Sequence, residues 1–204
     1  RSLTISTIGE KLLDANNVRY LTTTKPLDSN NWELVDRASF KERSLYLYKN
    51  PKETSRAYIA SDYKVATTIG EFRQILEKKD ADILKTVVLE KDVDLPNSDQ
   101  ETKGEVEITL NNNTRVVLQA KLNQKSLVVL SDSYYPGWKA YTDGQETKIL
   151  PANINSRAVV VPAGNHKIEY LYEPNHLKIG VTASIISLLL TLGIFQFLKS
   201  KKLF

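Results

Sequence analysis

An uncharged stretch near the C-terminus limits most strongly what this chain can fold into. Residues 179–198 read IGVTASIISLLLTLGIFQFL and hold no charged side chain. Twenty helical residues extend about 30 Å, which matches the hydrocarbon core of a bilayer. A buried helix of a soluble protein is the alternative, but such helices are usually shorter and carry a polar stripe. We therefore expect residues 178–204 to form a transmembrane helix with a short tail.

The lysines that flank this stretch are unequally distributed. Lys178 precedes it, whereas Lys199, Lys201 and Lys202 follow it. Positively charged flanks stay on the cytoplasmic side of a membrane. The sequence thus predicts a cell-membrane protein with a cytoplasmic C-terminus and with residues 1–177 outside the cytoplasm.

Small side chains recur in the stretch at intervals of three and four residues. They are Gly180, Ala183, Ser184, Ser187 and Thr191. Such a face lets a second helix approach closely, although a lone anchor tolerates small residues at any position. The chain also contains no methionine, so Arg1 is not a native start. We expect a fragment of a longer protein, with N-terminal transmembrane helices of the same chain as partners.

Composition excludes several classes of function. The net charge is +4, but residues 178–204 hold four lysines and no acidic residue, so residues 1–177 carry no net charge. No basic stripe with interleaved aromatic residues occurs there, and we expect no nucleic-acid partner. The chain has no cysteine, which removes thiolate nucleophiles, cysteine metal sites and disulfides.

No catalytic or cofactor motif occurs in the sequence. Phosphate-binding glycine loops and hydrolase signatures are missing. The two histidines, His166 and His176, are ten residues apart, whereas structural zinc usually has four ligands. Asp92, Asp94, Asn97 and Asp99 lack the glycine and glutamate of a calcium loop. We expect no catalytic residue, no metal and no cofactor in this chain.

The soluble part divides at a polar segment. Residues 1–89 mix predicted helices over 8–18 and 68–79 with short strands, which indicates a small mixed α/β subdomain. Its strands are predicted over 19–24, 32–35, 44–48, 56–60 and 85–89. Residues 90–103 are polar and acidic, contain Pro96, and are predicted to be a linker.

Residues 104–177 are typical of an antiparallel β-sandwich, because short strands alternate with turn signals. The strands are predicted over 105–110, 114–120, 126–131, 138–142, 146–150, 157–161 and 166–172. Asp143-Gly144 predicts a hairpin that pairs Ala140 with Thr147 and Trp138 with Ile149. Pro136-Gly137 suits a type II turn. The expected fold class is α+β: the mixed subdomain, a jelly-roll-like sandwich and one C-terminal transmembrane helix.

A family resemblance rests on residues 131–174. They read SDSYYPGWKAYTDGQETKILPANINSRAVVVPAGNHKIEYLYEP and are followed by the apolar stretch. The order of a YYPGW turn, a DG hairpin, an RAVVVPAGNH element and a strand ending at EP resembles the C-terminal end of the YfhO family of bacterial membrane proteins. KLLDANNVRYLTTT at 11–24 and RAYIASDYKVATT at 56–68 resemble the family's preceding region.

This resemblance implies a large polytopic membrane protein. Family members are regarded as GT-C type glycosyltransferases that use a polyprenyl-phosphate-linked sugar to decorate envelope glycans outside the membrane. The catalytic acids of such enzymes lie in loops between N-terminal membrane helices, so no catalytic residue is transferred to this chain. The implied partners are the bilayer, the missing membrane helices, and an envelope glycan or a polyprenyl-phosphate sugar.

Four residues are candidates for glycan binding: Tyr134, Tyr135, Trp138 and Arg157. Sugars stack on aromatic faces, and an arginine can bind a glycan or a lipid phosphate. The structural alternatives are that Trp138 is a core residue of the sandwich and that Arg157 pairs with Asp132 or Asp143.

The sequence leaves two main functional hypotheses. The first is an accessory extracytoplasmic region of a polytopic membrane glycosyltransferase that modifies cell-envelope glycans. The alternative is a single-pass, membrane-anchored surface binding or adhesion module without catalysis. A self-contained soluble enzyme is the weakest hypothesis, because no site for one is found.

Overall fold

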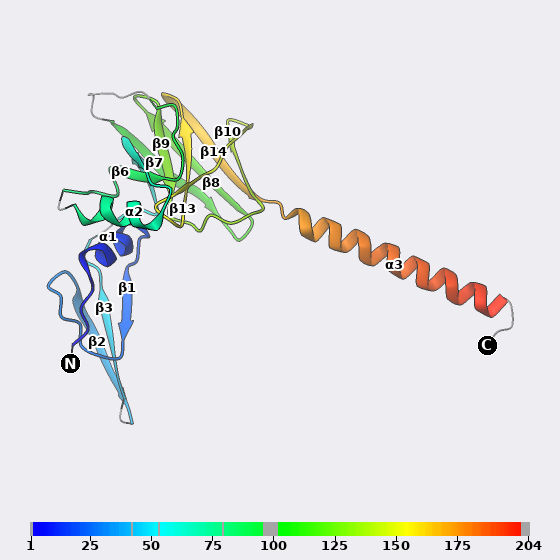
Figure 1. The fold of residues 1–204 in the computed structure, drawn as a ribbon, viewed down its shortest axis with the longest axis horizontal. Helices are drawn as coiled ribbons and strands as arrows, with labels where there is room; N and C mark the ends of the chain where they lie inside the picture. The colour runs from blue at the N-terminus through cyan, green and yellow to red at the C-terminus, as the bar shows by residue number, and fades with distance from the viewer. Residues whose placement is uncertain (1, 42, 53, 79, 96–101, 201–204) are drawn as a thin grey trace.

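Two β-sheets packed face to face form the largest part of the structure, and one long helix extends away from them (Figure 1). The computed structural model describes residues 2–41, 43–52, 54–78, 80–95 and 102–200. The five-stranded sheet is antiparallel, in the order β11-β10-β14-β8-β7. Its strands are β7 (Gly104–Asn111), β8 (Arg115–Leu122), β10 (Trp138–Thr142), β11 (Gln145–Thr147) and β14 (Gly164–Tyr172).

The second sheet has six strands in the order β4-β9-β13-β12-β6-β5. Its strands are β4 (Ala57–Ala60), β5 (Asp62–Val65), β6 (Thr86–Leu89), β9 (Ser126–Leu130), β12 (Leu150–Ala152) and β13 (Ser156–Val161). Within this sheet, β5 and β6 pair in parallel and are joined through α2 (Ile69–Glu77), whereas its other described strand pairs are antiparallel. This sheet takes strands from both sides of residues 90–103, so backbone pairing crosses the predicted linker. The division into domains at that segment stays a prediction.

The main core lies between the two sheets. Strand β9 shows why, because it reads SLVVL and is buried along its whole length. Successive side chains of a strand point to opposite faces. Val128 and Leu130 enter the core between the sheets, whereas Leu127 and Val129 pack in a second cluster on the outer face of the six-stranded sheet. The predicted α+β class with a β-sandwich is confirmed.

The N-terminal region adds α1 (Thr7–Ala15) and a three-stranded sheet of β1 (Tyr20–Thr23), β2 (Glu33–Phe40) and β3 (Arg43–Lys49). Helix α1 begins where the Ser6 side chain accepts a hydrogen bond from the Gly9 backbone N–H. Helix α2 begins with a capping box between Thr68 and Glu71. The two helices meet in an apolar cluster that includes Ala15 and Leu76.

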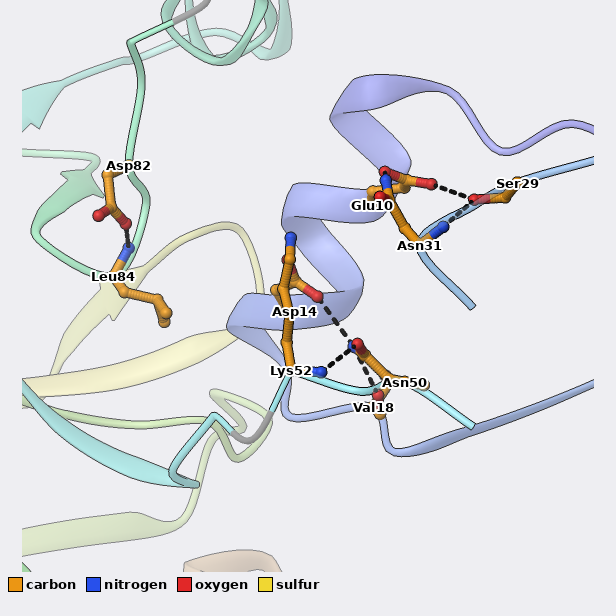
Figure 2. A network of polar contacts seen from close by, with 9 residues as sticks. All are labelled: Glu10, Asp14, Val18, Ser29, Asn31, Asn50, Lys52, Asp82 and Leu84. Atoms are coloured by element: carbon orange, nitrogen blue, oxygen red, sulfur yellow. Dashed lines mark hydrogen bonds and ion pairs between the residues drawn. The ribbon is translucent and has the colours of Figure 1, made fainter. Parts of the chain in front are cut away.

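Polar contacts hold α1 against the loops of the three-stranded sheet (Figure 2). The amide of Asn50 donates to Asp14 at 2.9 Å and to the carbonyl oxygen of Val18 at 3.3 Å. Lys52 forms an ion pair of 2.6 Å with the same carboxylate. Because Asn50 is buried, these bonds satisfy a polar group that would otherwise be costly to bury.

Most predicted elements are present, and the differences have physical reasons. The helix predicted over 8–18 ends at Ala15, where Asn17 takes a positive φ of 52°. The strand predicted over 146–150 splits into β11 and β12, which lie in different sheets. The pair Ala140–Thr147 is confirmed. Trp138 pairs instead with Tyr172 of β14, because the chain leaves the hairpin after Thr147.

Helix α3 (Asn175–Ser200) follows β14 and has the properties of a transmembrane helix. Residues 179–200 reach a mean hydropathy of 2.1 and are not buried against the rest of the protein. The hydroxyl groups of Ser184 and Thr191 donate to the carbonyl oxygens of Gly180 and Ser187, at 2.9 and 2.8 Å. The helix therefore satisfies these polar groups internally, as a lipid environment requires.

Candidate functional site

Residues 131–138 (SDSYYPGW), called the YYPGW turn below, connect β9 with β10 at the end of the sandwich from which α3 leaves (Figure 1). Trp138 pairs with Tyr172, the last residue of β14. The Glu173 backbone N–H donates to the Gly137 carbonyl oxygen at 2.6 Å. The turn is thus hydrogen-bonded to the segment that leads into the membrane helix.

The local sequence explains the shape of this turn. The Trp138 N–H donates to the Tyr135 carbonyl oxygen at 3.4 Å, with Pro136 and Gly137 between them. Proline fixes φ at the first central position, and Gly137 has a φ of +103° at the second. A Cβ atom on Gly137 would lie 2.9 Å from the ring of Tyr172. Only glycine provides both this backbone conformation and this close approach.

Asp132 joins three separate segments through its carboxylate. Arg56, just before β4, donates from Nε to Oδ1 and from Nη2 to Oδ2, both at 2.7 Å. Arg157 of β13 donates from Nη2 to Oδ2, also at 2.7 Å. The Ser131 N–H adds a backbone bond of 2.8 Å to the Arg56 carbonyl oxygen. The start of the YYPGW turn is therefore fixed to β4 and β13 at once.

Arg157 is the most unusual member of this cluster, because its side chain is only 2% exposed. Its Cζ lies 4.1 Å from the ring centroid of Trp138 and 5.0 Å from that of Tyr170. Burial lowers the pKa of Arg157, although the charge of Asp132 opposes this effect. The hydrogen bond to Asp132 raises the pKa of Arg56, which is more exposed.

The cluster holds one positive charge in excess, with two guanidinium groups around one carboxylate. Nε and Nη1 of Arg157 have no hydrogen-bond acceptor among the described residues. The buried hydroxyl groups of Tyr170 and Ser156 likewise have no partner there. Burial raises the pKa of Tyr170, so this phenol stays neutral. The faces of Trp138 and Tyr170 supply the main stabilisation of the buried cation besides Asp132.

Two surface pockets of about 200 and 180 Å³, together called the groove below, share the lining residues Leu89, Glu90 and Pro151. The first of them reaches the YYPGW turn at Tyr134. The pocket nearer the turn is also lined by Tyr134, Lys91 and Lys148. The farther pocket is more apolar, with Ile69, Phe72 and Ile154 among its residues. An aromatic face beside charged donors and acceptors is able to bind a polar ligand with apolar faces, such as a sugar.

The four predicted glycan-binding residues have different environments. Tyr134 and Tyr135 are 44% and 61% exposed, and Tyr134 lines the groove. Trp138 is half-buried, packs against the core, and has its ring 5.3 Å from that of Tyr172. Arg157 pairs with Asp132. Glycan contact stays a prediction, and the burial of Arg157 leaves the two tyrosines as the accessible members.

Sequence reasoning missed two members of the cluster. Arg56 lies 76 residues from Asp132, and no local pattern predicts this contact. Ile168, Tyr170 and Tyr172 are spaced two residues apart along a strand and so share one face. This spacing was the available signal that Tyr170 faces inward.

Among the described residues, His166, Asp92 and Asp94 have partners within the fold. Nδ1 of His166 lies 2.6 Å from Asp143, and Nε2 lies 3.2 Å from the Ala163 carbonyl oxygen. Both partners are acceptors, so the protonated imidazole fits best, and the bond to Asp143 raises the pKa of His166. Of the predicted acidic segment, Asp92 accepts from Tyr63, and Asp94 pairs with Lys125 at 2.7 Å.

Metal binding finds no support within the described residues, where no three His, Asp or Glu side chains form a group that could hold a metal ion. The side chain of His176 lies outside the described residues, as do Asn97 and Asp99. The absence of a metal site stays a prediction.

Replacing Asp132→Asn should destabilise the protein strongly. The change leaves two arginines without a counter-charge, one of them buried, and breaking such a pair costs about 3–5 kcal/mol. The control is Glu77→Gln, which breaks the exposed pair Arg73–Glu77 and should cost under about 0.5 kcal/mol. Urea unfolding of the full chain in detergent micelles, followed by tryptophan fluorescence, measures both. Equal losses would show that the carboxylate does not hold the turn.

The comparisons with known proteins are consistent with this structure. A family model described as "Bacterial membrane protein YfhO" matches residues 85–184, from β6 into α3. The comparisons with curated proteins and with solved structures give no match. The match includes the YYPGW turn but not residues 11–24 or 56–68, whose resemblance stays a prediction. Together with the apolar helix α3, this match fits a fragment of a YfhO-family membrane protein.

Proposed function

We propose that this chain is an accessory extracytoplasmic region of a polytopic membrane glycosyltransferase, which modifies cell-envelope glycans with a polyprenyl-phosphate-linked sugar. The match to the YfhO family model and the apolar helix α3 support a role at a membrane. The observation that carries the proposal is the position of the groove. It begins at Tyr134, in a turn bonded to the residues directly before the membrane helix.

This position suits a glycan at a membrane surface. A lipid-linked sugar is presented at the level of the headgroups, because its lipid part lies in the hydrocarbon core. A site that receives the sugar or its acceptor therefore has to lie close to that level. The groove meets this requirement at the end that contains Tyr134, since the YYPGW turn is adjacent to the start of α3.

The proposed role of each residue follows from whether its side chain is exposed or buried. Tyr134 stacks on a sugar ring, and Lys91, Lys148 and Glu90 bond to its hydroxyl groups, since all four line the same pocket. Trp138 and Arg157 position the turn. The transfer step belongs to membrane helices of the same protein that lie outside this chain. A single-pass binding module would share the groove and α3, and it would differ in having no such neighbouring helices.

Tyr134→Ala in the whole protein should lower transfer to the glycan acceptor. Losing one aromatic contact of about 0.5–1.5 kcal/mol corresponds to a rise of roughly two- to tenfold in the KM for the acceptor. The control is Tyr20→Ala, which removes a similarly exposed tyrosine (56%) from the three-stranded sheet. The measurement is sugar transfer from a polyprenyl-phosphate donor in membrane vesicles. If neither variant lost transfer, the glycan role of Tyr134 would be contradicted. If the unaltered protein transferred no sugar, the proposed activity itself would be contradicted.

The orientation is testable by cysteine labelling, because the chain has no cysteine of its own. Gln145→Cys places a thiol in the exposed β10–β11 hairpin, and Lys202→Cys places one after the membrane helix. Cysteines elsewhere in the whole protein are first replaced by serine. A membrane-impermeant maleimide should label position 145 in intact cells, and position 202 only after permeabilisation. The opposite pattern would show that the domain is cytoplasmic.

A further inference from the structure

The tip of the YYPGW turn, formed by Tyr135 and Pro136, extends past the end of β14 because of the strand register. Strands β10 and β14 are antiparallel, with Trp138 opposite Tyr172. Residues before Trp138 therefore continue in the direction in which β14 leads into α3. The hydrogen bond from the Glu173 N–H to the Gly137 carbonyl oxygen extends the backbone pairing of β10 with β14 by one residue. A Cβ atom on Gly137 would lie 3.4 Å from Pro174 Cα, directly before the first residue of α3.

The length of α3 before its apolar part places this tip at the depth of the lipid headgroups. The helix begins at Asn175, and its apolar part begins at Ile179. Four helical residues rise about 6 Å. Each headgroup layer is about 5–8 Å thick, from the difference between the whole bilayer and its hydrocarbon core. A turn beside Pro174 therefore lies at the outer edge of that layer or within it.

The side chains at the tip suit such a position. Tyr135 is 61% exposed, and Pro136 is exposed beside it. Tyrosine is enriched at membrane–water interfaces, because its ring is apolar and its hydroxyl group stays hydrated. The turn is also rigid at its base, since Asp132 is bound by two arginines and the Trp138 ring packs on Tyr172.

We propose that Tyr135 and Pro136 form a second membrane contact of this domain, seated among the lipid headgroups beside the first turn of α3. With α3, this contact gives the sandwich two attachment points on the bilayer. Two points restrict how the domain tilts, whereas a single helix leaves it free to pivot. The proposal goes beyond the glycan role and does not depend on it, because it requires only that α3 spans a bilayer.

The test places a single environment-sensitive fluorophore on the full chain in phosphatidylcholine–phosphatidylglycerol vesicles. Tyr135→Cys carries the label at the tip, and Gln145→Cys carries it at the opposite end of β10 as the control. Spin-labelled lipids with the nitroxide at the headgroup should quench the label at 135 several-fold more than the label at 145. Equal quenching at the two positions would overturn the proposal.

A second experiment separates anchoring by Tyr135 from mere nearness to the bilayer. The label is moved to Ser133→Cys, which is exposed in the same turn, and Tyr135 is changed to Trp or to Asp. Because tryptophan also prefers the interface and aspartate does not, quenching at 133 should persist in the Trp variant and fall several-fold in the Asp variant. Unchanged quenching in the Asp variant would show that the tyrosine does not anchor the turn, and would overturn its role.

Discussion

The carboxylate of Asp132, shared between Arg56 and Arg157, is the interaction on which the rest of the structure depends. It connects the start of the YYPGW turn to Arg157 of β13 and to Arg56, the residue directly before β4. A buried charge is costly, and Arg157 reduces this cost through one ion pair and two aromatic faces. One of those faces belongs to Trp138, at the other end of the YYPGW turn. The same cluster thus fixes both ends of the turn.

This arrangement joins a soluble fold to a membrane helix without a long linker. Strand β14 is central in the five-stranded sheet, paired with β8 on one side and β10 on the other. Only Glu173 and Pro174 separate it from α3. The YYPGW turn lies against this short connection through Gly137, so the groove at Tyr134 keeps a defined place relative to the membrane helix. In the proposed function, that place is where a lipid-linked glycan would be presented.

Much of this fold could be predicted from local patterns. The DG hairpin, with Asp143 and Gly144 at φ values of 52° and 82°, follows from turn chemistry. The apolar stretch of α3 follows from length and hydropathy. The split of residues 145–152 between two sheets could not be predicted, because β12 is fixed by pairing with β6 and β13 rather than by its own residues. The inclusion of β4 in the sandwich depends on distant pairing with β9.

The candidate site could be predicted only in outline. Tyr134, Tyr135, Trp138 and Arg157 stand out by residue type, but their burial is set by tertiary packing. The sequence offered Asp132 and Asp143 equally as partners of Arg157. The structure selects Asp132, because Asp143 lies in the β10–β11 hairpin and bonds to His166. The groove was not predicted at all, since Leu89, Lys148 and Pro151 meet only through the pairing of β6 with β12.

Amide hydrogen exchange at Glu173 tests most directly whether the YYPGW turn is fixed to the base of the membrane helix. The full chain in micelles should show slow exchange at this amide, which donates to Gly137. Gly137→Ala should accelerate it, because the added Cβ atom would lie 2.9 Å from the Tyr172 ring. Gly144→Ala, also at positive φ but with no atom within 4 Å of the new Cβ, should leave it slow. Fast exchange at Glu173 in the unaltered chain would contradict this account.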